Sequence, residues 1–167
     1  NPSGKLPITY PIHEGQLPLT YNHHPTGRGD DYHNLSGEPL FPFGYGLSYT
    51  HFEISDLQLS KKNLKSTDTL NVKVKVKNKG TRDGAEVVQL YIKDMLSSVG
   101  RPIIELKGFE KVYLKAGEEK VISLNLNIEE LAFLDEEMNW NVEKGEYRIM
   151  IGNSSKNLPL KVSIYVQ

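Results

Sequence analysis

The chain has 167 residues, a net charge of −1 and no cysteine. Because 20 Lys and Arg are balanced by 21 Asp and Glu, we expect neither nucleic acid nor an anionic membrane surface as a partner. The absence of cysteine excludes disulfides and thiolate chemistry. No stretch reaches the ~20 apolar residues of a membrane span. The sequence opens on Asn1 without Met or a signal-like apolar segment, so we expect it to be cut from a longer chain.

The first 50 residues carry seven of the nine prolines and four of the five histidines. Proline has no amide hydrogen and a fixed φ, so this spacing forbids a long helix and would interrupt a central strand. The segment is nevertheless too rich in apolar and aromatic side chains to be a solvated linker. Residues 1–50 are therefore predicted to form a long extended arm, rich in proline, glycine and aromatic residues, that lies against another surface.

From residue 51 the hydrophobic period becomes two, which is typical of strands with one buried face. Turn signals containing glycine separate the alternating runs. The apolar positions of these runs are Leu70, Val72, Val74 and Val76; Val88, Leu90 and Ile92; Ile122, Leu124 and Leu126; Tyr147, Ile149 and Ile151; and Leu158, Leu160, Val162, Ile164 and Val166. Residues 51–167 are predicted to be all-β, an immunoglobulin- or fibronectin type III-like antiparallel sandwich of about seven strands.

Three local features interrupt this regular pattern. The alternation changes phase within 104–114, which predicts a bulge or bend near Gly108. One helical turn is predicted at 128–134, with Asn127 as N-cap and with Leu131 and Leu134 closed over one end of the core. The single tryptophan, Trp140, is expected to pack in the core or at a strand end.

Candidate chemical groups are sparse. Asp30 and Asp31 are adjacent carboxylates, but neighbours in an extended chain point to opposite sides, so a turn or contact role is favoured over catalysis. None of the five histidines has the His-x-x-x-His spacing that would place two imidazoles on one metal. We therefore predict no catalytic residue, no metal site and no cofactor.

Two binding alternatives remain open. Arg28, Gly29 and Asp30 spell an integrin-recognition tripeptide, although they precede the sandwich, whereas adhesive copies need a protruding loop between its strands. The fold could also bind carbohydrate by itself, with Trp140 as the stacking residue. Either role would make the chain a free-standing carbohydrate-binding or adhesion module.

Six collinear segments together resemble one family, the glycoside hydrolase family 3 enzymes. Residues 1–11 look like the end of that family's second, α/β domain, and 15–28 look like its linker. Residues 39–50 (PLFPFGYGLSYT) are similar to its most recognisable C-terminal signature. The match continues within the sandwich through residues 84–92, 101–109 and 140–147.

This resemblance implies a β-glucosidase-like enzyme that hydrolyses terminal β-glycosidic bonds with a carboxylate nucleophile and a carboxylic acid/base. In the family both groups lie upstream of the segment that this chain resembles, so no residue here inherits either role. The implied function is a non-catalytic accessory domain that stabilises or docks onto the upstream barrel and α/β domains. The expected interdomain docking residues are Tyr21, His23, Arg28, Phe41, Phe43, Tyr45 and Tyr49.

The resemblance has three further implications. The longer enzyme would act on an oligo- or polysaccharide. Its location would be secreted or periplasmic. The extended segment 6–10 would belong to the sheet of the α/β domain, so in this chain it is expected to be poorly supported or paired with a neighbouring molecule.

Overall fold

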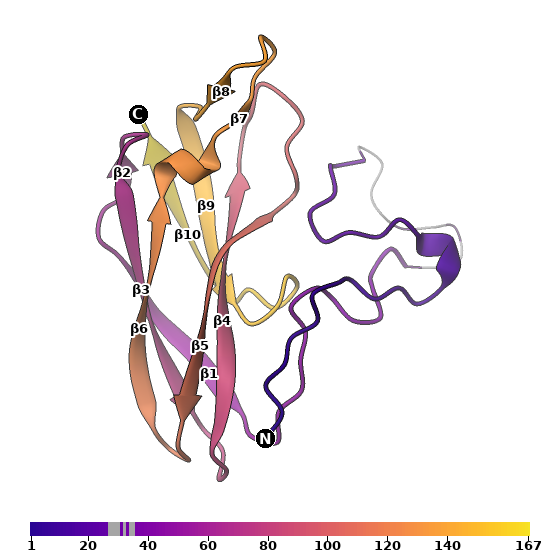
Figure 1. Cartoon of the computed structure of the whole chain (residues 1–167), viewed down its shortest axis with the longest axis vertical. Coiled ribbons are helices and arrows are strands. Elements are labelled where there is room, and N and C mark those ends of the chain that lie inside the picture. The colour runs from indigo at the N-terminus through magenta and orange to yellow at the C-terminus, as the bar shows by residue number, and fades with distance from the viewer. Residues whose placement is uncertain (27–30, 32, 34–35) are drawn as a thin grey trace.

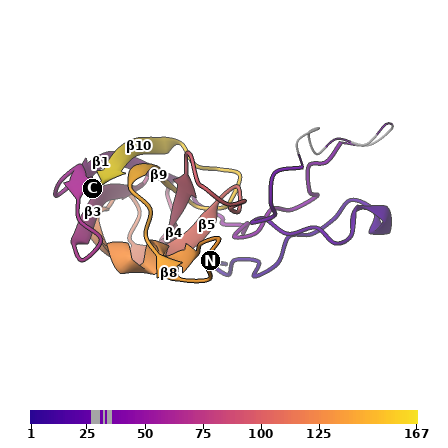
Figure 2. The same ribbon diagram turned by 90° about the horizontal axis from the view of Figure 1, so that it is seen from above.

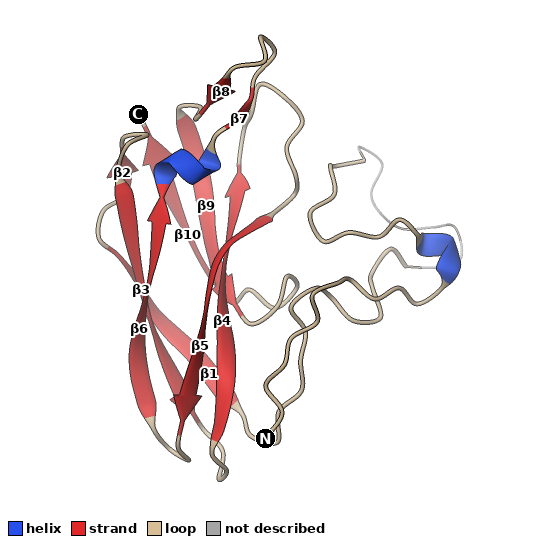
Figure 3. Ribbon diagram, viewed as in Figure 1, coloured by secondary structure: helices blue, strands red, loops and turns tan. Residues whose placement is uncertain are grey.

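The computed structural model describes residues 1–26, 31, 33 and 36–167. A β-sandwich forms one body, and an arm extends from its side (Figures 1 and 2). Nearly all regular structure is strand, as Figure 3 shows. Within the described residues, no helix is long and apolar enough to cross a membrane.

Two sheets make up the sandwich, and the predicted sandwich is confirmed. The smaller sheet has the order β1-β3-β6 and the larger has the order β2-β10-β9-β4-β5. Every pair in these sheets is antiparallel except β2 with β10. The strands are β1 (Phe52–Leu59), β2 (Asn63–Leu64), β3 (Thr69–Asn78), β4 (Gly84–Asp94), β5 (Glu105–Leu114), β6 (Glu119–Asn127), β9 (Gly145–Gly152) and β10 (Leu160–Val166).

The core lies between the two sheets and follows the period of two in the sequence. On β3 and β6 the inward positions pair directly, with Val72 opposite Leu124 and Val74 opposite Ile122. Val74 is fully buried, as are Leu90 and other apolar residues of the facing sheet. Burying one such side chain stabilises the fold by roughly 1.5–3 kcal/mol relative to leaving it exposed. Apart from Val121, the outward positions of β3 and β6 are polar, so this face is solvated.

The predicted irregularity near Gly108 is confirmed as a β-bulge. Leu90 pairs with Gly108, whereas the next residue, Tyr91, pairs with Leu106. Lys107 is therefore the extra residue on β5, and the strand changes phase there. This extra residue explains why the apolar positions within 104–114 do not all fall on alternate residues.

The predicted helical turn exists, but part of its expected role is wrong. It is a 3₁₀ turn, η2 (Ile128–Leu131), whose N-cap Asn127 makes no side-chain capping bond to the backbone. The Asn127 amide instead donates to the Glu130 carboxylate at 2.9 Å. Leu131 is fully buried as expected, whereas Leu134 is 38% exposed. Leu134 lies on β7 (Phe133–Leu134), where strand alternation buries Phe133 and turns Leu134 outward.

The prediction that Trp140 is buried is wrong. Trp140 lies on β8 (Trp140–Asn141), which pairs only with β7 as a short hairpin beyond the end of the core. Its side chain is 73% exposed. The hairpin lies at the end of the sandwich (Figure 1), and its indole is left on the surface.

The arm folds back on itself, which corrects the expectation that residues 6–10 lack support. The amide of Leu6 donates to the Tyr45 carbonyl at 2.8 Å, and the amide of Gly44 donates to the Leu6 carbonyl at 2.8 Å. Farther along, the amide of Tyr10 donates to the Phe41 carbonyl at 2.8 Å. The two ends of the arm therefore run antiparallel beside each other (Figure 1).

Beyond this ribbon, the short 3₁₀ turn η1 (Glu14–Gln16) is fixed by one buried amide. Gln16, only 2% exposed, accepts hydrogen bonds from the amides of Ile12 and His13. Its own amide donates to the carbonyls of Ser36 and Glu38. Because Gln16 bonds to both Ile12–His13 and Ser36–Glu38, these described parts of the arm hold each other in a defined structure.

Candidate docking site between the arm and the sandwich

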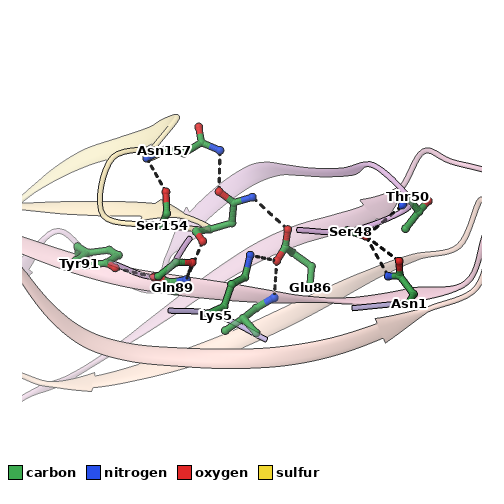
Figure 4. A network of polar contacts seen from close by, with 12 residues as sticks. Asn1, Lys5, Ser48, Thr50, Glu86, Gln89, Tyr91, Ser154 and Asn157 are labelled. Carbon is green, nitrogen blue, oxygen red and sulfur yellow. Dashed lines mark hydrogen bonds and ion pairs between the residues drawn. The ribbon is translucent and has the colours of Figure 1, made fainter. Parts of the chain in front are cut away.

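The arm contacts the outer face of the larger sheet through a buried polar cluster centred on Gln89 of β4. Gln89 is 3% exposed, and its amide nitrogen donates to the carbonyl of Gly44 in the arm at 3.1 Å. The same nitrogen donates to the Asn153 carbonyl at 2.8 Å, while the amide oxygen accepts from the Tyr91 hydroxyl at 2.6 Å. One side chain therefore joins the arm, strand β4 and the turn after β9 (Figure 4).

An ion pair stands next to this amide. Lys5 Nζ lies 2.6 Å from Glu86 Oε1, and the two side chains are only 14% and 9% exposed. Glu86 also accepts hydrogen bonds from the amide of Val87 and from the side chain of Asn153. The carboxylate is thus fully engaged, and the pair fixes the beginning of the arm to β4 (Figure 4). We call the five residues of this contact the junction cluster: Lys5, Gly44, Glu86, Gln89 and Asn153.

Aromatic rings extend the contact toward the bulge. Tyr21 and Phe43, both from the arm, stack with centroids 4.2 Å apart, and Tyr21 meets Tyr91 of β4 edge to face at 5.9 Å. The amide of Leu106 donates to the Tyr21 hydroxyl at 3.3 Å. Burial, with a smaller contribution from Tyr21, raises the pKa of Tyr91 far above its ordinary value, so its hydroxyl remains a proton donor toward Gln89.

The arm is also bonded to loops at both ends of the larger sheet. The amide of Ser155 donates to the Phe43 carbonyl at 2.9 Å, and the amide of Ile103 donates to the His23 carbonyl at 3.0 Å. A cavity of about 480 Å³ remains between the arm and strands β4, β9 and β10. Lys93 and Arg148 line it, as do Glu38 and Lys156.

The predicted docking residues divide into three groups. Tyr21, His23 and Phe43 face this chain's own sandwich through the contacts above. Phe41 and Tyr45 stack on each other within the arm, with centroids 5.0 Å apart. Tyr49 is 73% exposed.

Arg28 lies outside the described residues, as do Gly29 and Asp30 of the proposed adhesion motif. The docking role of all seven predicted residues stays a prediction. Asp31 accepts hydrogen bonds from Ser36 and from the amide of Gly37, which is the turn-contact role favoured from the sequence.

The polar part of the junction was missed by sequence reasoning. Gln89 and Tyr91 alternate with the core residues of β4. This alternation predicted that both side chains point to a solvated face of the strand. Both are in fact buried, at 3% and 0% exposure, because the arm covers that face. The available signal was the composition of β4, where an amide and a tyrosine occupy the second face in place of the lysines found on β3.

No chemistry beyond binding follows from this geometry. Within the described residues, no group of three or more His, Asp or Glu side chains could hold a metal ion. The buried carboxylate of the junction, Glu86, is neutralised by Lys5. The arrangement fixes an arm on a sandwich and leaves apolar arm residues exposed.

Comparison with known proteins gives consistent matches along the whole chain. A fibronectin type III-like domain family matches residues 86–155. The chain is 46% identical to thermostable beta-glucosidase B of Acetivibrio thermocellus, covering 99% of this chain and 24% of that protein. It is 42% identical to the periplasmic beta-glucosidase of Salmonella typhimurium, covering 93% of this chain and 22% of that protein.

Solved structures agree with these relatives. A beta-glucosidase from Listeria innocua, in complex with glucose, superposes with a TM-score of 0.93 at 38% identity, covering 99% of this chain and 24% of that one. A beta-glucosidase from Erythrobacter marinus gives the same TM-score at 43% identity, with 99% and 22% covered. The chain thus spans less than a quarter of the length of these relatives. It is identified as a fibronectin type III-like domain with its preceding arm, corresponding to the C-terminal region of beta-glucosidases.

Proposed function

We propose that the chain is the non-catalytic accessory domain of a larger glycoside hydrolase family 3 enzyme and that its arm fixes the sandwich to the catalytic domains. The larger enzyme would be β-glucosidase-like and would hydrolyse terminal β-glycosidic bonds of an oligo- or polysaccharide. The present chain would contribute stability and domain placement, not catalytic groups.

One observation carries this proposal: the arm is fixed to the sandwich by buried polar contacts and still exposes many apolar side chains. The buried contacts are those of the junction cluster. The described residues of the arm also include eight large exposed apolar side chains, which are Ile8, Tyr10, Ile12, Leu17, Leu40, Phe41, Leu47 and Tyr49. Exposed apolar surface of this extent, close to a rigid scaffold, is typical of a contact with another protein surface. The relatives are four to five times longer than this chain, and the rest of such a polypeptide would supply that surface.

Two carboxylates of the sandwich, Glu86 and Glu105, are held in structural ion pairs, in keeping with a non-catalytic role. A retaining glycosidase needs two carboxyl groups about 5–5.5 Å apart, one of them with a raised pKa. Glu86 is salt-bridged to Lys5. Burial alone would raise the pKa of Glu105, but the hydrogen bond from Arg101 and the charges of Lys107 and Arg101 outweigh it and lower that pKa. Glu86 and Glu105 are each paired with a basic side chain in a structural contact.

The test uses the longer enzyme. Replacing Leu47 and Tyr49 with Ser should lower its melting temperature and speed proteolytic release of the C-terminal region, because both side chains would lose their apolar partner. Val121→Ser, at a 67% exposed position on β6, is the control and should change neither property. Removal of residues 51–167 should act in the same direction as the arm substitutions. An unchanged melting temperature together with unchanged kcat/KM in both variants would refute the proposal.

The proposed location is secreted or periplasmic. A periplasmic beta-glucosidase of Salmonella typhimurium is among the relatives, at 42% identity. Fractionation of cells that express the full gene would place the enzyme outside the cytoplasm, whereas recovery in the cytoplasmic fraction would contradict this part.

A further inference from the structure

A second apolar surface lies at the end of the sandwich, away from the junction cluster. Leu96 is 86% exposed, Met138 is 72% exposed and Trp140 is 73% exposed, with Leu134 at 38%. Met138 and Trp140 belong to the hairpin of β7 and β8, whereas Leu96 belongs to the loop after β4 (Figure 1). Isolated exposed apolar residues are ordinary, but several large ones at one end of a domain mark an interaction surface.

The two segments that carry these residues are bonded to each other. The amide of Ser98 donates to the Glu143 carboxylate at 3.1 Å, and the Ser98 hydroxyl donates to the same carboxylate. The guanidinium of Arg101 lies 4.2 Å from the ring centroid of Phe133, beneath the hairpin. The segments at this end of the sandwich are therefore held together by direct contacts and do not form independent loops.

The hairpin fixes the backbone that carries the indole. Trp140 pairs with Leu134 across the hairpin. Asp135 accepts hydrogen bonds from the amides of Glu137 and Asn139, at 3.1 and 2.9 Å. These bonds close the turn, and Met138 takes a φ of 64° within it. A backbone that is already held in place loses little further freedom on binding, so the side chain it carries is suited to anchor a contact.

Charge restricts the kind of partner. Between Phe133 and Glu143 the sequence carries Asp135, Glu136 and Glu137 but no Lys or Arg. An apolar centre containing Trp and Met, surrounded by charged residues, has the composition of a protein-binding hot spot. The complementary surface would hold an apolar pocket for the indole with a neutral or basic rim.

The same end of the sandwich is connected to the arm. The loop between β4 and β5 donates a hydrogen bond from the amide of Ile103 to the His23 carbonyl, at 3.0 Å. In Figure 1 this loop lies on the side of the sandwich from which the arm extends. The hairpin end and the exposed arm can therefore reach one large partner at the same time.

We propose that the hairpin from Phe133 to Asn141, with Trp140 as its anchor, is a second docking surface for the catalytic part of the same polypeptide. The inference rests on the proposed function, which supplies that partner. The relatives have more than three quarters of their length beyond the region matched here, enough chain to cover both the arm and the hairpin.

Hydrogen exchange of the longer enzyme and of the 167-residue chain tests this directly. Amides of residues 133–141 should exchange more slowly in the longer enzyme than in the isolated chain. Trp140→Ala should abolish that difference and lower the melting temperature of the longer enzyme while leaving that of the isolated chain unchanged. Tyr165→Ala, at a 47% exposed position on β10, is the matched control and should alter neither.

Equal exchange of 133–141 in the two proteins, or no effect of Trp140→Ala on the longer enzyme, would overturn the inference. Protection of residues 40–49 is read in the same experiment, so failure of the hairpin contact is separable from failure of the proposed arm contact. Because Trp140 is the single tryptophan, its fluorescence in the isolated chain reports other occupants. A blue shift on titration with cellobiose or laminaribiose would assign the surface to saccharide, and a shift on raising protein concentration would assign it to a second copy. Either result would also overturn the proposal.

Discussion

Gly44 of the arm and Gln89 of β4 are in direct contact, and the contact depends on the absence of a side chain at position 44. Gln89 donates to the Gly44 carbonyl at 3.1 Å, and Gly44 has a φ of 79°. A Cβ at position 44 would overlap the side-chain amide of Gln89. The arm can approach the sandwich this closely only through glycine, because other residues rarely adopt this backbone conformation.

Gly44→Ala should therefore destabilise the chain for two reasons. The positive φ alone costs about 1–3 kcal/mol for a residue with a side chain, and displacement of Gln89 adds to that cost. Urea denaturation measures the free energy of unfolding. Gly117→Ala is a matched control, because Gly117 has a φ of 77° but open space around it. Equal losses in the two variants would show that contact with Gln89 contributes nothing.

Gln89→Glu tests the buried amide. The substitution removes the donor that serves the carbonyls of Gly44 and Asn153 and places a carboxylate oxygen beside them. Leaving buried acceptors unpaired costs about 1–3 kcal/mol, and an ionised carboxylate costs more. The loss should diminish at acidic pH, where protonation restores a donor. Gln58→Glu, on the exposed side of β1, should have little effect at any pH; equal destabilisation at both sites would contradict this account.

Lys5→Ala tests the ion pair that fixes the beginning of the arm. Glu86 would remain largely buried without its cation, so the loss should be about 1–3 kcal/mol, and residues 1–10 should exchange their amide hydrogens faster. Lys156→Ala provides the comparison. Lys156 pairs with Glu38 at 2.8 Å, but both side chains are more than half exposed, and such pairs contribute about 0–1 kcal/mol. Similar losses for the two lysines would indicate that burial of the first pair is unimportant.

Asp94→Asn should raise the free energy of unfolding at neutral pH. Burial raises the pKa of Asp94, opposed in part by Arg101, while Glu143 and Glu105 add to the increase. Among the described residues, its Oδ2 has no hydrogen-bond partner. A carboxyl whose folded pKa is raised binds its proton more tightly when folded, so ionisation destabilises the fold above that pKa.

The advantage of Asp94→Asn should accordingly shrink as the pH falls through the raised pKa, and should vanish below the ordinary value of 3.8. The free energy of unfolding of both proteins, measured across this pH range, checks the direction of this trend. Glu136→Gln alters an exposed carboxyl at the same end of the sandwich and should give no such trend. A gain in stability from Asp94→Asn that grows on acidification would contradict the assignment.

The sandwich could be predicted because its signal is local. Alternating side chains such as Val72, Val74 and Val76 can be buried on only one face of a strand, and that period exists in the sequence before any folding. The phase change at Gly108 is equally local, since one extra residue moves the following side chains to the opposite faces of the strand. The family resemblance was also carried by continuous segments, and the relatives match nearly the whole chain.

What only the tertiary structure decided is which surfaces are covered. The period of β4 is the same whether its second face meets water or the arm, so the burial of Gln89 and Tyr91 depended on a segment some 45 residues away. The prediction for Trp140 was wrong in the opposite sense, since a residue expected to be buried is exposed. Hydrophobicity favours burial only where other residues can cover the side chain, and the β7–β8 hairpin extends past the core. Local pattern determines strands; the packing of distant segments determines which of their faces remain free.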